Sequence, residues 1–404
     1  MRVLHLTSGS LSSGSGKGAL RLHQGLLGIG VDSHLATTDR NYPKNIKNIL
    51  SKGLLLRSLF NSANQLISEV RQIGHGIGRS ELYSFAENPL SVYSTINFGE
   101  YDIVHLHWVN YALSVTETAR LAEKHNVVWT MRDMWPLTGG CHYSLSCERF
   151  KHGCGKCRLI TDSHTEDISA VQFRLKVSAF KKIRFVAISD WLLEQASLSK
   201  IINKDRLSRI YNSVDPDVFS KRPDKKGLTE KLKIKTNRKI VIVGAQNLRD
   251  EYKGPREVRK FLSLHADDYF FIFFGTNLNE IIQGIAGLKY LSLGFISEHR
   301  LAEAFNVSDV FLMLSVQEAF GKTVVESLYC GTPVVVMPGS APFEIISIFG
   351  DAAGIVWDGK SNINNAICNL IDSSSAIPLN DIKEKFSLDR IAKEYETIYL
   401  ECRR

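Results

Sequence analysis

Short apolar runs alternate with amphipathic segments of helical spacing along most of the chain. In the first half the apolar runs are RVLHLTS, SHLAT, DIVHLHW, VVWTM and RFVAIS, with RIYNSV as a sixth candidate. In the second half they are KIVIVGA, FFIFFG, YLSLGF, VFLMLS and PVVVMPG. Most of them lack polar alternation, which is typical of strands buried on both faces. The pattern predicts an α/β fold in which helices cover both faces of parallel sheets.

The chain divides near residue 220, where the polar stretch NSVDPDVFSKRPDKKGLTEK has the composition of a linker. We expect one Rossmann-like domain over residues 1–220 and a second one over residues 221–385. A C-terminal amphipathic helix over residues 386–404 is expected to cross back to the first domain. Open α/β sheets bind ligands beyond the carboxyl ends of their strands, so we expect the two domains to face a central cleft.

Composition narrows the class of protein. Apolar residues make up 44% and charged residues 23% of the chain, which are ordinary values for a folded domain. The longest apolar runs have the length of strands, and MRVLHLTSG is not followed by a signal segment, so the expected compartment is the cytoplasm. The net charge of +8 is dispersed and no nucleic-acid motif accompanies it, so nucleic acid is not an expected partner.

Residues 44–72 combine Lys and Arg with Leu, Ile and Phe at roughly helical spacing. This pattern suits an amphipathic helix that lies on an anionic membrane surface, on the inner face of the cytoplasmic membrane. A surface helix packed on the domain core would show the same spacing. Both interpretations stay open at the level of sequence.

Two Gly–Lys turns look like fragments of a P-loop without matching one. GSGKG (14–18) and FGKT (320–323) have Leu11 and Val316 where a P-loop requires glycine, and Gly18 stands where the first would need a hydroxyl. An ATPase or GTPase is therefore not expected. Each turn still lies between a predicted strand and a predicted helix, where free amides and the helix dipole favour an anion.

Segment 315–345 carries the strongest candidate chemistry. A predicted strand ends before Glu318, and a predicted helix starts near Lys322 with Glu326 in its first turns. This spacing places Glu318 at the mouth of the expected cleft and presents the amides of residues 321–323 to a phosphate. Carboxylates are bidentate acceptors for paired hydroxyls, so two of them around a phosphate site indicate a nucleotide sugar.

This segment resembles the Glu-x7-Glu signature of retaining glycosyltransferases of family 4, which have the GT-B fold. The resemblance covers nearly the whole chain, including ALRLHQGL, GVDSHL, VAIS, IYNSVD, KG (253–254), LGF (293–295) and the C-terminal helix. DIVHLHW and VVWTMRDMWPLTGGCHY are similar to the exopolysaccharide and colanic-acid branch. The resemblance implies a hexosyltransferase that uses a UDP- or GDP-sugar, requires no metal or other cofactor, and acts on a lipid-linked oligosaccharide or growing surface polysaccharide.

Carried over residue by residue, the resemblance implies a donor site. Glu318 would bind hydroxyls of the donor sugar and Glu326 those of the ribose, whereas Lys253 would hold the diphosphate. Phe295, after Gly294, would lie beside the nucleobase. The other expected donor-binding residues are Gly16, Lys17, Gly18, Phe320, Gly321, Lys322 and Thr323.

Two positions depart from the family pattern. Asn247 stands where a cation six residues before Lys253 is usual, and Arg249 would supply the missing charge to a diphosphate leaving group. Arg132 stands where a histidine usually follows the strand VVWTM. Because arginine cannot act as a base, it would serve as a fixed cation for the phosphate, a sugar hydroxyl or an acidic acceptor. The purely structural alternative is a salt bridge with Asp133 or between the domains.

The resemblance further implies that the leaving group departs and the acceptor attacks on the same face of the sugar. Cations and helix amides would hold the diphosphate, and Glu318 would orient the ring. The expected catalytic set is Glu318, Arg132 and Asp133, the last through acceptor or loop contacts. The alternatives are a GT-B enzyme of another class, such as a nucleotide-sugar epimerase or a phosphorylase, and a catalytically silent relative that binds a glycan or nucleotide.

Four of the seven cysteines lie after the strand VVWTM and fall within a span of 17 residues: Cys141, Cys147, Cys154 and Cys157. The lack of a secretory signal argues against a disulfide framework. Four soft ligands can close a tetrahedral zinc site, although the spacing of the first pair differs from the usual zinc knuckle. Zinc or another metal, free thiols, and disulfide pairing are the three interpretations that the sequence leaves.

Overall fold

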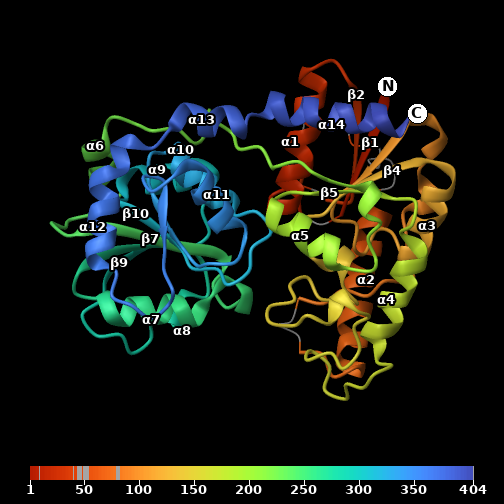
Figure 1. The fold of residues 1–404 in the computed structure, drawn as a ribbon, viewed down its shortest axis with the longest axis horizontal. Coiled ribbons are helices and arrows are strands. Elements are labelled where there is room, and N and C mark those ends of the chain that lie inside the picture. The colour runs from red at the N-terminus through yellow and green to blue at the C-terminus, as the bar shows by residue number, and fades with distance from the viewer. Residues whose placement is uncertain (9, 40, 43–47, 49–53, 79–81, 404) are drawn as a thin grey trace. The chain divides into compact units, whose positions relative to one another are not determined.

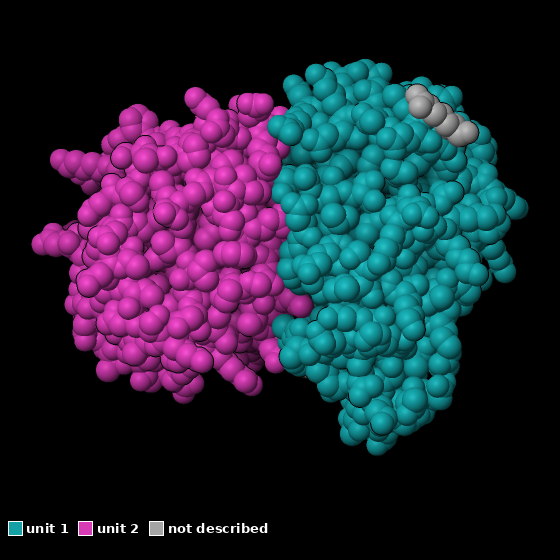
Figure 2. Space-filling view, in the orientation of Figure 1, with its two compact units in different colours: residues 1–213, 388–404 teal, residues 214–387 magenta. Residues whose placement is uncertain are grey.

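Parallel pairing of the apolar runs builds two six-stranded sheets, one in each of two units of the chain (Figure 1). The structure is a computed structural model that describes residues 1–8, 10–39, 41–42, 48, 54–78 and 82–403. The first unit comprises residues 1–213 and 388–404, and the second comprises residues 214–387 (Figure 2). The prediction of parallel sheets with flanking helices is confirmed.

The sheet of unit 1 has the strand order β2-β1-β3-β4-β5-β6. Its strands are β1 (Arg2–Thr7), β2 (Asp32–Thr37), β3 (Ile103–Leu106), β4 (Asn126–Thr130), β5 (Arg184–Ala187) and β6 (Leu207–Arg209). The helices of unit 1 are α1 (Gly14–Gly28), α2 (Leu54–Gly74), α3 (Val115–Lys124), α4 (Ile168–Ala179), α5 (Asp190–Leu198) and α14 (Leu388–Cys402). Short 3-10 turns are η1 (Tyr93–Thr95), η2 (Phe98–Glu100), η3 (Trp135–Leu137), η4 (Arg149–Lys151) and η5 (Lys204–Arg206).

The C-terminal helix α14 belongs to unit 1, where it packs along α1. A Cβ at Gly25 of α1 would come within 2.7 Å of Leu388 Cδ1, so the close approach of the two helices depends on this glycine. Ile391, Tyr395 and Tyr399 of α14 are buried. The last residues of the chain therefore complete the core of its first unit.

The sheet of unit 2 has the strand order β12-β11-β10-β7-β8-β9. Its strands are β7 (Lys239–Asn247), β8 (Tyr269–Thr276), β9 (Lys289–Ser292), β10 (Val310–Met313), β11 (Val334–Val336) and β12 (Gly354–Val356). Its helices are α6 (Lys225–Lys231), α7 (Pro255–His265), α8 (Leu278–Ile282), α9 (Glu298–Val307), α10 (Lys322–Tyr329), α11 (Ala341–Phe349), α12 (Asn364–Ser373) and α13 (Leu379–Lys385), with the 3-10 turns η6 (Glu251–Lys253) and η7 (Ser374–Ala376).

Two strands differ from the expectation. The sixth strand of unit 1 lies at 207–209, ahead of most of RIYNSV, because the chain leaves the sheet after the Ile210 amide donates to Ala187 O. In unit 2 the edge strand β12 was not predicted, since its three residues begin with glycine and form no extended apolar run. No described helix is long and apolar enough to cross a membrane. Within the segment 44–72, residues 44–47 and 49–53 lie outside the described residues, and α2 begins at Leu54.

Candidate active site

Two loops of unit 2 are hydrogen-bonded together where the neighbouring strands β7 and β10 end. The amides of Val316 and Gln317, after β10, donate to Tyr252 O at 2.9 and 3.2 Å. Gly254 has a φ of 69°, and a Cβ there would overlap Leu314 O, so only glycine allows this contact. The two loops therefore form one continuous surface at the carboxyl edge of the sheet, where α/β folds bind ligands.

This surface carries a mostly buried ion pair. Lys253 Nζ, at the end of η6, contacts Glu318 Oε2, and the two side chains are only 15% and 13% exposed. The same Nζ lies 4.8 Å from the centroid of the Tyr252 ring. The structure thus brings together the residue predicted to hold the diphosphate and the one predicted to bind the sugar.

A second group of charges lies at the start of α10. Lys322 Nζ is 2.9 Å from Glu298 Oε1, at the start of α9, and 2.7 Å from Glu326 Oε1. The helix begins after Gly321, which has a φ of 80° and leaves the first turn without a side-chain cap. Uncapped amides at a helix start attract anions. This helix start therefore combines an ammonium group, two carboxylates and a positive dipole end.

The remaining residues of this predicted donor site fall into two groups. Phe320 is buried, with its ring 5.7 Å from that of Phe386, and Thr323 Oγ1 contacts Met313 Sδ at 3.8 Å, so these two side chains pack inside unit 2. Phe295 follows Gly294 after β9 and is 68% exposed. Of these side chains, only Phe295 presents an exposed aromatic face to which a nucleobase could bind.

Asn247, which stands in place of the usual cation, and Arg249, its proposed substitute, both have partners other than the Lys253–Glu318 pair. Asn247 is used within its own loop: its Nδ2 donates to Asp250 Oδ1 at 2.6 Å, and its Oδ1 accepts from the Arg249 amide at 3.1 Å. The Arg249 guanidinium pairs with Glu280 of α8, and both side chains are exposed. In the part of the chain that the structure describes, no contact joins Arg249 to Lys253.

In unit 1, Arg132 follows β4 and lies against the first turn of α1. A Cβ at Gly18 would overlap the guanidinium, and one at Gly16 would overlap Ser10 O. Ser13 caps the helix by accepting from the Gly16 amide at 3.2 Å. The glycines predicted as a phosphate loop therefore make room for an arginine beside the positive end of a helix, and Lys17 lies in the same turn.

Arg132 has no carboxylate partner among the residues described. Nη1 donates to Asn212 Oδ1, Nη2 donates to His107 Nδ1 at 3.1 Å, and Nε is buried without a hydrogen bond. Burial lowers the pKa of this guanidinium. A cation held beside a helix N-terminus without a counter-charge is unfavourable until an anion joins it, so the arrangement is suited to binding one.

Asp133, the next residue, is occupied elsewhere. Its Oδ1 accepts from the Trp135 amide at 2.8 Å, and its Oδ2 lies 2.8 Å from His142 Nδ1. The structural alternative of a salt bridge between Arg132 and Asp133 is therefore absent from the described contacts. Asp133 stabilises the turn that follows β4, a loop contact of the kind expected for it. Both of its carboxylate oxygens have partners in this turn.

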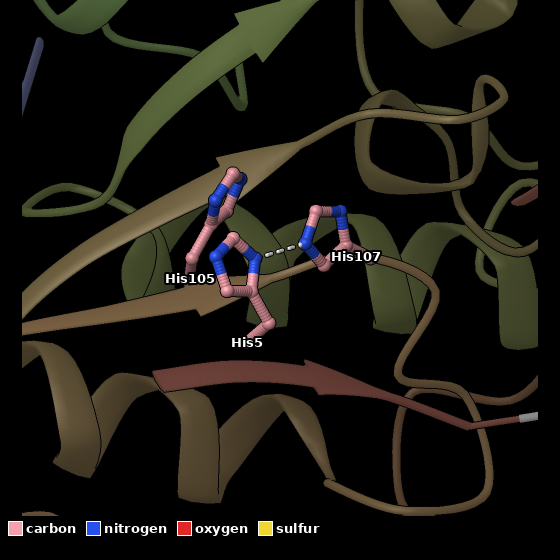
Figure 3. Close-up of side chains that lie close together, drawn as sticks. All are labelled: His5, His105 and His107. Atoms are coloured by element: carbon pink, nitrogen blue, oxygen red, sulfur yellow. Dashed lines mark hydrogen bonds between the residues drawn. The ribbon is translucent and has the colours of Figure 1, made fainter. Parts of the chain in front are cut away.

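Three buried histidines, His5, His105 and His107, lie close together (Figure 3), and His107 contacts Arg132. An arginine can only donate, so His107 Nδ1 must accept from it, and the proton of His107 then lies on Nε2. That nitrogen is 2.9 Å from His5 Nδ1, which must accept in turn, and His5 Nε2 is left as an N–H group without a partner. The guanidinium thus fixes the tautomers of two rings on neighbouring strands.

His105 forms a separate hydrogen-bonded branch. Its Nδ1 is 2.6 Å from the Tyr399 hydroxyl, and its Nε2 is 2.8 Å from Thr130 Oγ1, which is itself 2.7 Å from the Tyr395 hydroxyl. Both tyrosines belong to α14. The C-terminal helix therefore anchors the end of β4, the strand that Arg132 directly follows.

The three histidines also satisfy the distance requirement of a metal site, because their ligand nitrogens lie within 4.8 Å of one another. Their chemistry does not suit one. Both nitrogens of His105 bond to hydroxyls, one nitrogen of His107 accepts from a guanidinium, and a divalent ion would lie beside that fixed positive charge. The cluster fits a hydrogen-bonded support better than a metal centre.

These histidines are not among the predicted site residues, although the sequence contains a signal for them. His105 and His107 alternate with apolar residues in DIVHLHW, and this spacing places them on the same face of a strand. His5 occupies the middle of the neighbouring strand β1, directly opposite His105. Glu298 was missed because nothing local connects a residue at the start of α9 with Lys322 of α10.

Acidification is expected to destabilise unit 1. Burial lowers the pKa of His5, His105 and His107 well below the usual value, so the folded protein keeps them neutral while the unfolded chain takes up protons. The contribution of these neutral histidines to the free energy of unfolding is fully present above about pH 6.5 and is lost as the pH falls. The limiting slope of this free energy against pH is about 1.4 kcal/mol per pH unit for each histidine. Thermal unfolding between about pH 7.5 and pH 5 measures this slope.

In the His5→Gln variant the free energy of unfolding should depend less steeply on pH, by the contribution of about one proton. In the His152→Gln variant, which replaces an exposed histidine, the pH dependence should equal that of the parent protein. A melting temperature of unit 1 that stays constant over this pH range would contradict the assignment of neutral buried rings.

Most of unit 2 matches a known protein family. Residues 225–381 match the family described as glycosyl transferases group 1. A protein of Escherichia coli (strain K12) named as a colanic acid biosynthesis glycosyl transferase, WcaC, is 23% identical in an alignment of 381 residues that covers 87% of this chain and 86% of that one. N-acetyl-alpha-D-glucosaminyl L-malate synthase of Bacillus anthracis is 25% identical in an alignment of 344 residues that covers 79% of this chain and 84% of that one.

Solved structures show the same fold. That of Anabaena HepE in complex with UDP and glucose aligns with a TM-score of 0.65 at 15% identity, covering 99% of this chain and all of that one. The protein is a glycosyltransferase of GT-B fold. Its residues 225–381 match the group 1 glycosyl transferases, and one similar protein is named for colanic acid biosynthesis.

Proposed function

We propose that this enzyme transfers a sugar, with retention of configuration, from a UDP- or GDP-sugar to a lipid-linked or growing surface-polysaccharide acceptor. The observation that carries the proposal is the Lys253–Glu318 ion pair, whose glutamate lies on the loop that leads to the Lys322–Glu326 pair at the start of α10. Each pair offers a cation for phosphate and a carboxylate for hydroxyls. The relative HepE, which was solved with UDP and glucose, supports a nucleotide-sugar donor.

Binding of the donor would exchange partners within these pairs. Lys253 is paired with Glu318, so a diphosphate that takes the ammonium group releases the carboxylate for a sugar hydroxyl. The same exchange at Lys322 releases Glu326 for the ribose. Because each carboxylate loses its cation only when the diphosphate arrives with hydroxyl donors, the site is arranged for both parts of a nucleotide sugar.

The transfer step requires no group other than donor and acceptor. The bond from the anomeric carbon to the diphosphate oxygen breaks, and the acceptor hydroxyl attacks the same face of the sugar. Its proton passes to the departing phosphate oxygen. Lys253 and the amides at the start of α10 would stabilise the charge that develops on this leaving group, so no metal ion is required.

Titration calorimetry with UDP, GDP and dTDP, followed by a donor screen on a polyprenyl-diphosphate oligosaccharide, tests this function. We expect one nucleotide to bind, and mass spectrometry to detect transfer in the presence of EDTA. The Glu318→Gln variant should bind the nucleotide but transfer about 10²–10³-fold more slowly. Failure of all three nucleotides to bind would overturn the proposal. L-malate belongs in the acceptor panel, because transfer to malate alone would reassign the acceptor to a small anion.

We further propose that α2 lies on an anionic membrane surface. The exposed side of its described part carries Leu66 and Val70, which are 62% and 60% exposed, together with Ile73. Its buried side carries Asn64 and Gln72, which bond to backbone carbonyls of unit 1. The large apolar residues in the described part of this helix therefore face outward, the reverse of a helix packed on a core, and an interfacial helix has this arrangement.

Replacing Leu66, Val70 and Ile73 together by serine is expected to weaken binding to phosphatidylglycerol vesicles by more than about tenfold, because burial of each side chain contributes roughly 1.5–3 kcal/mol at most. Co-sedimentation with vesicles measures this loss. The matched control is Leu264→Ser, which removes an exposed leucine of α7 in unit 2. Equal sedimentation of the triple variant and the parent protein would contradict membrane docking through α2.

A further inference from the structure

The four clustered cysteines surround a small cavity in unit 1. Cys141, Cys147, Cys154 and Cys157 all line it, and its volume is about 20 Å³. A cavity of roughly 10–15 Å³ already holds a water molecule, so a metal ion fits. All seven cysteines of the chain are free thiols, so the four clustered cysteines form no disulfide bonds. We infer that this cavity is a structural zinc site in which four thiolates bind one Zn²⁺ ion.

The surrounding backbone needs an anchor. Between η3 and α4 the chain runs through residues 138–167 with only the short turn η4 as a helical element. Irregular segments of this length are uncommon in compact domains. Within it, Cys154 and Lys156 have positive φ angles of 57° and 46°, a conformation that is unfavourable for residues other than glycine. A metal ion bound by both sulfur atoms of Cys-x-x-Cys would stabilise this turn.

Hydrogen-bond donors are directed at the sulfur atoms. The Gly139 amide donates to Cys154 Sγ at 3.2 Å. The Leu159 amide is a hydrogen-bond donor to the sulfur of Cys157, whereas the Ser169 hydroxyl donates to Asp167 Oδ1 at 2.6 Å. A thiol is a weak acceptor, whereas a metal-bound thiolate is a strong one. The donors therefore suit sulfur atoms that carry negative charge.

A fully buried lysine supplies the complementary charge. Lys176 of α4 donates to Trp135 O at 2.7 Å and to Thr138 O at 3.0 Å, and its Nζ lies 3.4 Å from the centroid of the Trp135 ring. Its contacts within the described residues include no ion pair with a carboxylate. Cys154, Cys141 and Asp133 are the acidic groups whose ionised forms would act on this ammonium group. Four thiolates around Zn²⁺ have a net negative charge that compensates this ammonium group, whereas four neutral thiols would leave it uncompensated.

Zinc binding would draw the thiols inward. Zinc–sulfur bonds of about 2.3 Å place the sulfur atoms of a tetrahedral site about 3.8 Å apart. Among the described residues, no three of these sulfur atoms all lie within 4.8 Å of one another, so the site closes by rotation of cysteine side chains into the cavity. His142, which lies in the same segment, is not a competing ligand, because its two ring nitrogens bond to Asp133 and Ser84.

Metal analysis of the full-length protein tests the site. Purified under reducing conditions without a metal-affinity tag, the protein should contain about one zinc per chain by mass spectrometry of the elements. Cys154→Ser and Cys157→Ser should each lower the affinity for zinc by more than about tenfold, and Lys176→Met by about tenfold. The controls Cys368→Ser and Cys402→Ser, which lie outside the cluster, should retain the metal.

A measurement on the parent protein avoids dependence on variants that fail to fold. Exchange of Zn²⁺ for Co²⁺ should produce the thiolate-to-cobalt absorption bands of a tetrahedral sulfur site, and alkylation should reach the clustered cysteines only after the metal is removed. Absence of zinc, iron in its place, or zinc that persists in the Cys154→Ser/Cys157→Ser double variant would overturn the inference. These results do not depend on sugar transfer, so the zinc site and the proposed function fail separately.

Discussion

Replacing Lys253 by alanine is expected to lower kcat/KM for sugar transfer about 10²–10³-fold, whereas replacing Arg249 by alanine changes it less than about fivefold. Both cations lie on the loop that follows β7. Only Lys253 contacts Glu318, and the pair is mostly buried, whereas Arg249 pairs with Glu280 in an exposed position. A donor held by Lys253 therefore loses a cation at the leaving diphosphate in the first variant and none in the second.

Initial rates with the donor identified by the screen measure this difference. Because removal of one partner from a buried ion pair also destabilises the fold, the Lys253→Met/Glu318→Gln variant is the structural control. It removes both charges, so it should melt near the parent temperature and still lack activity. If Arg249→Ala lowered activity as much as Lys253→Ala, the assignment of Lys253 as the main cation for the diphosphate would be contradicted. Arg249 would then be assigned as a diphosphate-binding residue.

Replacing Arg132 by methionine is expected to lower transfer about 10²–10³-fold without lowering the melting temperature. Arg132 lies beside the first turn of α1 with no carboxylate partner among the described residues, so its removal relieves an uncompensated positive charge. The anion that it binds in the working enzyme would lose its fixed cation at the same time. A loss of activity without a loss of stability is the signature of a residue kept for function.

The ligand of Arg132 follows from two further measurements on the same variant. A weaker affinity for the free nucleotide assigns the guanidinium to the donor diphosphate, and a raised KM for the acceptor at unchanged nucleotide affinity assigns it to an acidic acceptor. The matched control is Arg174→Met, which removes an exposed arginine of unit 1 that pairs with Glu166. Full transfer activity in the Arg132→Met variant would contradict both assignments.

Local pattern was sufficient for most of the architecture. Runs such as KIVIVGA and DIVHLHW are buried on both faces in the parallel sheets, and burial of a whole strand leaves a continuous apolar signal. The start of α10 at Lys322 was predicted because a glycine before a helix is a local feature. The strand β12 escaped prediction because three residues contain too little periodicity, and its pairing with β11 defines it.

The sequence by itself determined where charged and aromatic side chains would stand relative to strand ends and helix starts, because those positions depend on neighbours along the chain. The tertiary structure alone decided their partners. In the tertiary structure Glu318 pairs with Lys253 and not with Arg249, and Gly18 lies directly beside the Arg132 guanidinium. Four cysteines line one cavity. Each of these contacts joins residues far apart in sequence or fixes a side-chain direction. Such contacts depend on strand order and helix packing, which no short stretch of sequence encodes.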